Sequence, residues 1–243
     1  MARIDLLDRG RAPRARAIPP LENGDCLTRA EFERRYEAMA GDAKFELVDG
    51  VVYMASPVKV EHGDFHLAVG GLFRDYAIAT PGCQAGADST VRLGPADEPQ
   101  PDVFLRLTTE SGGLSRIDRN GYVSGPVELA AEVASSTASY DLNQKKRSYL
   151  RHGVLEYLAV LTRTRRVLWF ARRGDAYSPI DPERGVLRSR VFPGLWVDVA
   201  ALLTGDGVRL KRTAAKGLRS KEHRAFVSGL RRKLRAKAGR GSQ

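Results

Sequence analysis

The chain lacks several features that mark common protein classes. Its 243 residues include two cysteines, Cys26 and Cys83, which lie far apart and belong to no C-x-x-C pair. This argues against a disulfide framework and against a structural zinc site. No apolar run approaches the length needed to span a bilayer, and no apolar stretch follows the N-terminal arginines as in a signal peptide. We therefore expect a cytoplasmic protein with reduced thiols.

The positive charge is concentrated at one end of the chain. Residues 209–243 contain thirteen Lys or Arg and a single acid, Glu222, whereas the preceding residues carry 27 basic and 28 acidic groups. The net charge of +11 therefore belongs to this basic tail. Residues 1–24 contain Arg, Pro and Gly without periodicity, which predicts a flexible arm. The length then suits one domain over residues 25–208.

The tail contains a helical pattern. Between residues 219 and 237 the apolar residues Phe226, Leu230 and Leu234 recur every four positions among arginines and lysines, which predicts an amphipathic basic helix. Such a helix can contact DNA phosphates, since neutralising each phosphate releases counterions. A solvated, partly disordered tail is an equally good interpretation, and a membrane surface or an acidic partner is a weaker one.

The first half of the domain gives three local signals. A capping box that begins at Thr28 predicts a helix. An Asp-Gly pair joins two β-prone runs within residues 44–54, which predicts a tight hairpin because this pair tolerates positive φ angles. Apolar residues at helical spacing between residues 62 and 76 predict a helix that packs on a sheet.

The second half alternates strands with helices. The apolar run at 127–134 predicts the most buried strand, and a helix is expected from Tyr140 to His152, with Gly153 as its C-cap. The fold class is therefore α/β, a mixed sheet with helices on its faces. The other signals predict strands at 83–93, 102–107, 155–161 and 166–172, a loop from Thr108 to Gly125, and a short closing helix that begins near 195–198.

One residue conflicts with its surroundings. Glu132 lies in the apolar strand at 127–134, where an isolated carboxylate is unfavourable unless a cation or a partner offsets its desolvation. A second acid, Asp102, opens the apolar strand at 102–107. Two acids at the ends of apolar strands suggest a divalent-metal site, and hydrolysis is the first function to test. The alternative is that Glu132 lies at the solvent edge of its strand.

Neighbouring segments supply further charged groups. Asp141, Lys145 and Tyr149 fall on one stripe of the predicted helix, and Lys146 points about a quarter-turn away. If the stripe faces the strand ends, Lys145 reaches the same space as Glu132; the alternative is a solvated Asp-Lys pair. Strand alternation in the hairpin sends Glu46 to the face opposite its apolar neighbours.

These motifs together have a familiar order. Glu46 lies in Phe-Glu-Leu-Val-Asp-Gly, Asp102 follows a proline, Glu132 begins Glu-Val-Ala-Ser-Ser-Thr, and the next helix carries Asp-x-x-x-Lys, followed by Gly-Val-Leu-Glu-Tyr at 153–157. Over roughly residues 28–203 the chain resembles the PD-(D/E)XK, restriction-endonuclease-like superfamily. It is most similar to the large bacterial branch of putative restriction endonucleases. The resemblance implies a restriction-endonuclease-like core.

The resemblance also implies a metal site. Mg²⁺ or Mn²⁺, which suit carboxylate oxygens, would be held by Asp102 and Glu132, with the backbone carbonyl of Val133 as a further ligand. Glu46 would hold a metal-bound water or a second ion. The expected reaction is the hydrolysis of DNA phosphodiester bonds.

The chain departs from the superfamily at one position. The usual lysine lies two residues beyond the strand glutamate, and Ala134 occupies that place. In this branch the lysine has moved to the following helix, so that Lys145 would orient or help to deprotonate the attacking water and stabilise the phosphate. Asp141 would position Lys145.

Other candidate residues carry less weight. His62 and His66 lie one helical turn apart, but no third metal ligand follows at a suitable spacing, so packing or exposure is the better interpretation. Gly70-Gly71 lacks the pattern of a phosphate-binding loop. Four aromatic residues in apolar contexts are most simply core residues: Tyr157, Trp169, Phe170 and Trp196.

The leading hypothesis is a metal-dependent endonuclease that acts on DNA, with the basic tail adding nonspecific affinity. A homodimer is plausible by resemblance to restriction enzymes, which often cut both strands with two sites. The absence of lysine at Ala134 favours an alternative, a catalytically inactive module that binds nucleic acid or a partner. A third, weaker hypothesis is an interaction protein whose tail recruits an acidic partner.

Overall fold

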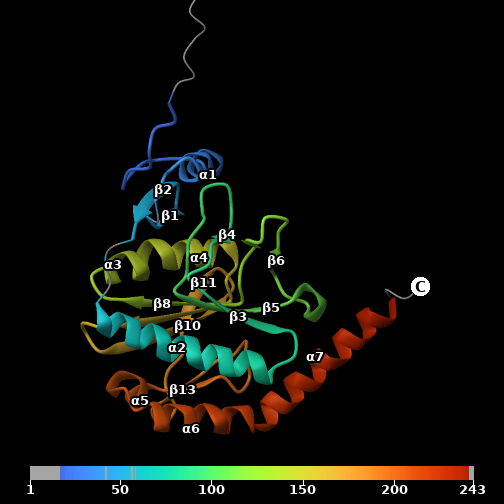
Figure 1. Ribbon diagram of the computed structural model, residues 1–243. Coiled ribbons are helices and arrows are strands. Elements are labelled where there is room, and N and C mark those ends of the chain that lie inside the picture. Colours follow the sequence, from blue (N-terminus) through green and yellow to red (C-terminus); the bar gives the residue numbers. More distant parts are fainter. Residues whose placement is uncertain (1–16, 42, 56, 58, 241–243) are drawn as a thin grey trace, which may run out of the picture.

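A six-stranded sheet forms the centre of the protein (Figure 1). The computed structural model describes residues 17–41, 43–55, 57 and 59–240. In the order β11-β10-β9-β8-β5-β3, strands β8 and β9 run parallel and the other neighbours run antiparallel. The sheet is therefore mixed, as expected. Its strands are β3 (Cys83–Ala87), β5 (Val103–Leu107), β8 (Leu129–Ala134), β9 (Glu156–Leu161), β10 (Arg166–Arg173) and β11 (Ala176–Pro179).

Helices cover both faces of this sheet (Figure 1). One face packs against α2 (Val60–Ala79), α5 (Val199–Thr204) and α6 (Gly207–Leu218), and the other against α3 (Ala138–Tyr140), the π-helical turn η2 (Asp141–Lys145) and α4 (Lys146–His152). Strand alternation explains the two layers, because Ala131 and Val133 of β8 pack with α2, whereas Ala130 and Ala134 pack with α4. Glu132 therefore belongs to the α4 face.

Smaller elements extend this framework. An N-terminal unit with its own apolar cluster consists of α1 (Arg29–Glu37), β1 (Phe45–Val48) and β2 (Val51–Met54). A three-stranded sheet has the order β4-β7-β6, with β4 (Val91–Arg92), β6 (Arg116–Ile117) and β7 (Val123–Ser124). The remaining elements are the 3-10 turn η1 (Thr109–Ser111), β12 (Val186–Arg188), β13 (Trp196–Asp198) and α7 (Lys221–Arg240).

Local sequence signals account for several element ends. The Thr28 side chain accepts a hydrogen bond from the backbone N–H of Glu31, which caps α1. Asp49 and Gly50 have φ angles of 55° and 75°, as the tight turn between β1 and β2 requires. Gly153 ends α4 in the left-handed conformation. The predicted first helix, hairpin and site helix are therefore confirmed.

Two expectations are wrong in detail. The segment from Thr108 to Gly125 is not simply a loop, because it contains η1, β6 and β7. Each of these strands has two residues, which is too short for an alternating pattern to show. Residues 196–198 form strand β13, and the closing helix begins only at Val199, where the Asp198 side chain caps it.

The basic tail is helical, as its apolar spacing predicts. Leu210 of α6 and Leu230 of α7 are buried in the main core cluster, and Phe226 packs against it. Thus α6 and part of α7 are held by the domain. Of the predicted arm, residues 1–16 lie outside the described residues, and Leu21 is buried in the N-terminal unit. Within the described part of the chain, no helix combines the length and hydropathy that crossing a membrane requires.

Aromatic residues and cysteines largely follow the sequence interpretation. Tyr157 and Trp169 are fully buried, whereas Phe170 and Trp196 are half-buried. Both cysteines are free thiols, Cys83 buried and Cys26 exposed.

Two helical glycines test the packing of these layers. A Cβ at Gly217 of α6 would lie 2.2 Å from the carbonyl oxygen of Gly194, whereas a Cβ at Gly71 of α2 would meet no atom within 4 Å. We expect Gly217→Ala to destabilise the protein by about 1–3 kcal/mol through this clash. Gly71→Ala should stabilise it by up to about 1 kcal/mol through helix propensity. Urea unfolding of the two variants measures both effects, and shifts of the same sign would contradict the packing described.

Candidate active site

Glu132 is almost completely buried, with 3% of its surface exposed. The register of β5 and β8 pairs Val103 with Ala131, and its continuation by one residue sets Asp102 opposite Glu132. The two acids predicted from separate strands are therefore neighbours. The alternative position of Glu132 at the solvent edge is wrong.

Lys145 supplies the charge that Glu132 needs. Its ammonium nitrogen lies 2.9 Å from Oε1 of Glu132 and 3.0 Å from Oε2 of Glu46, and its side chain is buried. Burial acts to lower the pKa of Lys145, but the two carboxylates raise it well above its ordinary value. Lys145 is therefore a buried ammonium shared by two acids from different parts of the chain.

The helix that follows β8 presents its predicted stripe to the sheet. Asp141, Lys145 and Tyr149 are all buried, and Lys146 instead lies over the ring of Phe170, 3.5 Å from its centroid. Asp141 to Lys145 form a π-helical turn, a local feature that is frequent at functional sites. The solvated Asp-Lys pair considered as an alternative is therefore wrong.

Two tyrosines complete the environment of the carboxylates. The hydroxyl of Tyr149, fully buried, donates a 2.7 Å hydrogen bond to Oε1 of Glu132. Tyr140 donates to Oε1 of Glu46 over 3.4 Å, and the backbone N–H of Gln100 donates to Oε2 of Glu46 over 3.2 Å. Glu46 lies opposite the buried face of its hairpin, as strand alternation predicts.

Asp102 is held from both sides. Its Oδ2 accepts a 2.6 Å hydrogen bond from the backbone N–H of Val133, and its Oδ1 lies 3.9 Å from Nε2 of His62. Nε2 of His66 donates a 2.7 Å hydrogen bond to the backbone carbonyl of Asp102. The histidines to which sequence reasoning gave little weight thus border the site. Their spacing of one helical turn was the available signal.

Asp97 was missed by sequence reasoning, because it lies in a polar loop. Its Oδ1 accepts hydrogen bonds from the backbone N–H of Asp49 at 3.0 Å and from the Ser148 hydroxyl at 2.5 Å. Its Oδ2 accepts from Arg151 and His152, both at 3.0 Å. One buried carboxylate therefore ties the turn of the β1-β2 hairpin, which carries Glu46, to α4, the helix that directly follows the turn carrying Lys145.

The site has more negative than positive charge. Burial raises the pKa of Glu132 well above its ordinary value; Lys145 lowers it, and Asp102, Asp141 and Glu46 raise it further. Burial also raises the pKa of Asp141, to about 6, although Lys145 opposes this. Four carboxyl groups thus face one ammonium. Such a site favours a further cation.

The carboxylate oxygens of this site are the kind of ligand that a hard divalent cation prefers. Hydrogen bonds among the described residues engage Oδ2 of Asp102 and Oε1 of Glu132. Oε2 of Glu132 lies outside that network, and Oδ1 of Asp102 has only the 3.9 Å contact with His62 among the described residues. Carboxylate oxygens of this kind suit Mg²⁺ or Mn²⁺. No group of three His, Cys, Asp or Glu side chains is arranged for an ion within the described ranges, so backbone oxygen and water would complete the coordination.

Comparison with protein families identifies the family of the chain. The sequence model of the Uma2 family, described as "Putative restriction endonuclease", matches residues 29–200, which is more than half of the chain. The chain belongs to the Uma2 family. The Uma2 match contains Glu46, Asp102, Glu132 and Lys145, and it ends before the basic tail. The resemblance inferred from the sequence motifs is confirmed.

A solved structure supports the fold. The chain is similar to a protein of Anabaena variabilis whose crystal structure is described as that of a putative nuclease belonging to DUF820. The TM-score is 0.56 at 12% sequence identity, over 70% of this chain and 96% of that one. The predicted restriction-endonuclease-like α/β fold is confirmed. Comparison with curated proteins gives no significant match.

The role of Asp97 can be tested through pH. Burial raises its pKa, but hydrogen bonds from His152, Asp49 and Ser148 outweigh this and lower the pKa from 3.8 to about 2. The stabilisation is therefore complete above the unfolded value and lost as the pH falls toward 2. We expect Asp97→Asn to reduce the free energy of unfolding by on the order of 2 kcal/mol at neutral pH.

Unfolding followed from neutral to acid pH measures this effect. The deficit of Asp97→Asn should shrink as the pH falls through about 4 toward 2, where the wild-type carboxyl is also protonated. The exposed acid Asp181 provides a matched control, Asp181→Asn, which should show no such deficit. A deficit of Asp97→Asn that is constant over the whole pH range would contradict the assignment.

Proposed function

We propose that the protein is a metal-dependent endonuclease that hydrolyses DNA phosphodiester bonds. The observation that carries this proposal is the convergence of Glu132 and Glu46 on the buried ammonium of Lys145, with Asp102 opposite Glu132 on the neighbouring strand. Membership of the Uma2 family and the fold of a structure described as a nuclease support it. A purely structural core has no chemical need for this set of charged groups, because burying them costs desolvation free energy.

Asp102 and Glu132 are the proposed ligands of Mg²⁺ or Mn²⁺, with the Val133 carbonyl as a further ligand and Glu46 holding a metal-bound water or a second ion. Two features support this set: the neighbouring positions of the two acids on β5 and β8, and the excess of negative charge around Glu132. A bound ion would supply an activated water and neutralise charge that develops on the phosphate.

Lys145 is the side chain proposed to act on the attacking water and on the phosphate. Its ammonium would orient the attacking water and stabilise the phosphate in the transition state. Ala134, at the superfamily's usual lysine position, is buried in the apolar cluster beneath α4. Asp141, on the same helix turn, would set the position of Lys145.

One observation favours a second candidate, a nuclease-like module that binds nucleic acid without cutting it. The Lys145 ammonium is engaged by two carboxylates, and an alanine occupies the usual lysine position. A module of this kind would keep DNA binding without any cleavage in Mg²⁺ or Mn²⁺.

Cleavage of plasmid and single-stranded DNA decides between these functions. With Mg²⁺ or Mn²⁺ we expect cleavage by the wild type, and a loss of about 100-fold or more in Lys145→Ala, since Lys145 acts at the reacting phosphate. Lys146→Ala is the matched control, because it removes a lysine from the next position that faces Phe170 instead. It should cleave like the wild type.

Asp102→Ala tests the ligand assignment in the same assay. Removing a metal ligand should abolish cleavage, whereas the exposed control Asp181→Ala should not. Cleavage that survives in Asp102→Ala would refute the site. Intact DNA binding without cleavage by the wild type would establish the binding module instead.

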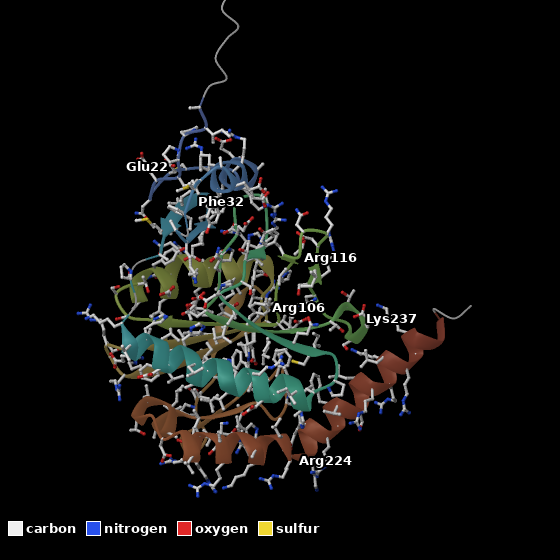
Figure 2. All side chains as sticks on the ribbon, in the orientation of Figure 1. Glu22, Phe32, Arg106, Arg116, Arg224 and Lys237 are labelled. Atoms are coloured by element: carbon white, nitrogen blue, oxygen red, sulfur yellow. The ribbon has the colours of Figure 1, made fainter. Side chains whose placement is uncertain are left out.

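The basic tail is proposed to add nonspecific affinity for DNA. Arg231, Arg232 and Arg235 of α7 are exposed, and Figure 2 shows Arg224 projecting from the same helix. Lys237 is instead engaged with the backbone carbonyl of Thr109 at 3.2 Å. Exposed arginines of this kind can replace condensed counterions along a DNA backbone. The proposal includes a homodimer that cuts both strands, which sedimentation at several concentrations would test.

Substitution is a cleaner test of the tail than deletion, because Leu210 and Leu230 belong to the core. We expect replacement of the three exposed arginines of α7 by Gln to weaken duplex binding and lower the slope of log affinity against log salt by up to about 3. The control replaces three exposed arginines elsewhere by Gln: Arg163, Arg166 and Arg173. Equal slopes for the two triple variants would exclude the tail as a specific phosphate contact.

A further inference from the structure

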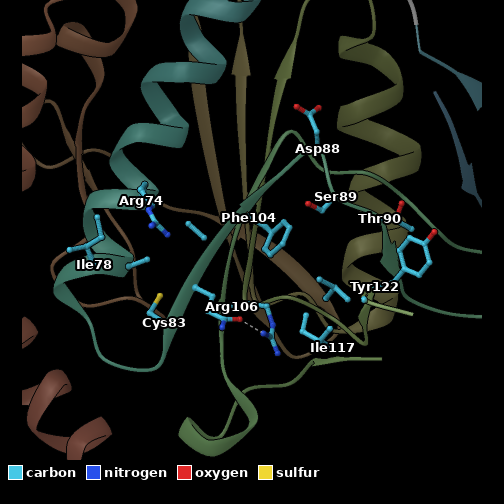
Figure 3. Close-up of a pocket in the computed structure, with 15 residues that line it drawn as sticks. Arg74, Ile78, Cys83, Asp88, Ser89, Thr90, Phe104, Arg106, Ile117 and Tyr122 are labelled. Carbon is cyan, nitrogen blue, oxygen red and sulfur yellow. Dashed lines mark hydrogen bonds between the residues drawn. The ribbon is translucent and has the colours of Figure 1, made fainter. Parts of the chain in front are cut away.

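A groove of about 640 Å³ runs along the outer side of β3 (Figure 3). β3 is the last strand of the six-stranded sheet, so one side of its backbone has no neighbouring strand in that sheet. Arg74 and Ile78 of α2 form one wall, and Ile117 of β6 and Tyr122, which directly precedes β7, form the other. The volume lies within the range typical of ligand sites.

The groove begins beside the candidate active site. Asp88 lines it, and its backbone N–H donates a 3.2 Å hydrogen bond to the carbonyl of Asp102. Oδ2 of Asp88 also lies 4.0 Å from Nε2 of His66. A chain bound along the groove would therefore lead directly to the proposed metal ligands.

Tyr122 has the arrangement of a fixed stacking platform. The guanidinium of Arg92 lies over its ring, 4.1 Å from the centroid, and Arg92 is itself held by Asp118 at 2.8 Å and Glu33 at 2.9 Å. One face of the ring is thus covered, yet 40% of Tyr122 is exposed. A ring held in this way can stack with a nucleobase at little cost in side-chain entropy.

The walls combine apolar surface with positive charge. Ile78 and Ile117 are 70% and 51% exposed, which is a large apolar exposure at the rim of a groove. Arg74 is also exposed, and it forms no ion pair with any residue that the structure describes. Proteins that bind single-stranded nucleic acid combine aromatic rings, on which bases stack, with basic side chains that contact phosphates along a groove. Tyr122 and Arg74 provide one of each.

We propose that this groove binds a single strand of nucleic acid that leads to or from the active site, with Tyr122 stacking on a base and Arg74 contacting a phosphate. The substrate class rests on the proposed nuclease function. In a duplex the faces of the bases are already stacked on one another, so no base face would be available to stack on Tyr122 or to contact the apolar walls. The groove therefore selects unpaired DNA.

The test is the binding of a fluorescent single-stranded oligonucleotide, and of the matching duplex, measured by anisotropy. Ca²⁺ replaces Mg²⁺, and the oligonucleotide is recovered afterwards to check that it is intact. Tyr122→Ala should weaken single-strand binding about 5- to 100-fold, and Tyr122→Phe, which keeps the ring, should bind within about threefold of the wild type. The duplex should be much less affected.

Arg74→Ala is an independent variant on the other wall. It should lower the slope of log affinity against log salt by about 0.7 for single strands. Arg173→Ala, an exposed arginine on β10 near the opposite edge of the sheet, is its matched control. Thermal unfolding of every variant verifies that it is folded.

Three outcomes would overturn the inference in distinguishable ways. Wild-type binding that is unchanged in both Tyr122→Ala and Arg74→Ala refutes the groove and leaves the proposed nuclease intact. Equal weakening of single strand and duplex refutes the preference for unpaired DNA. Failure of the wild type to bind either form refutes the DNA substrate itself, and the groove proposal with it.

Discussion

The shared ion pair of Lys145 is the interaction on which the site depends. Its ammonium lies within 3.0 Å of carboxylates from β8 and from the β1-β2 hairpin, two segments that are distant in the sequence. Removing one partner from a buried ion pair typically destabilises a protein by about 3–5 kcal/mol, because it leaves an uncompensated buried charge. Each of the three charged groups therefore offsets the desolvation cost of the others. The pair therefore fixes the hairpin, the strand and the π-helical turn in one arrangement.

Hydrogen bonds from the surrounding residues hold these charged groups in place. Asp97 joins the hairpin turn to α4, Tyr149 holds one oxygen of Glu132, and the backbone of Val133 holds one oxygen of Asp102. The other oxygens of the two strand acids accept no hydrogen bond from the residues that the structure describes. Carboxylates held in this way would need little reorganisation on binding a cation, which supports the proposed metal site.

Sequence patterns predict the fold and the charged centre well, and for a physical reason. The apolar strand around Glu132 and the helical spacing of Asp141, Lys145 and Tyr149 are local signals, and a buried acid demands a partner. The strands of the small sheet and the role of Asp97 depend on contacts between distant segments, so the local periodicity of the sequence does not predict them. His62 and His66 were visible as a pair, but only the packing of α2 beside Asp102 gives them a neighbour.

The central claim is that Asp102 and Glu132 form a divalent-metal site whose excess negative charge the ion relieves. Calorimetric titration of Mn²⁺ into the metal-free protein, without DNA, tests it most directly. We expect the wild type to bind Mn²⁺ and Asp102→Ala to lose that binding, because the variant lacks one of the two strand carboxylates. Absence of Mn²⁺ binding by the wild type, or equal binding by Asp102→Ala, would contradict it.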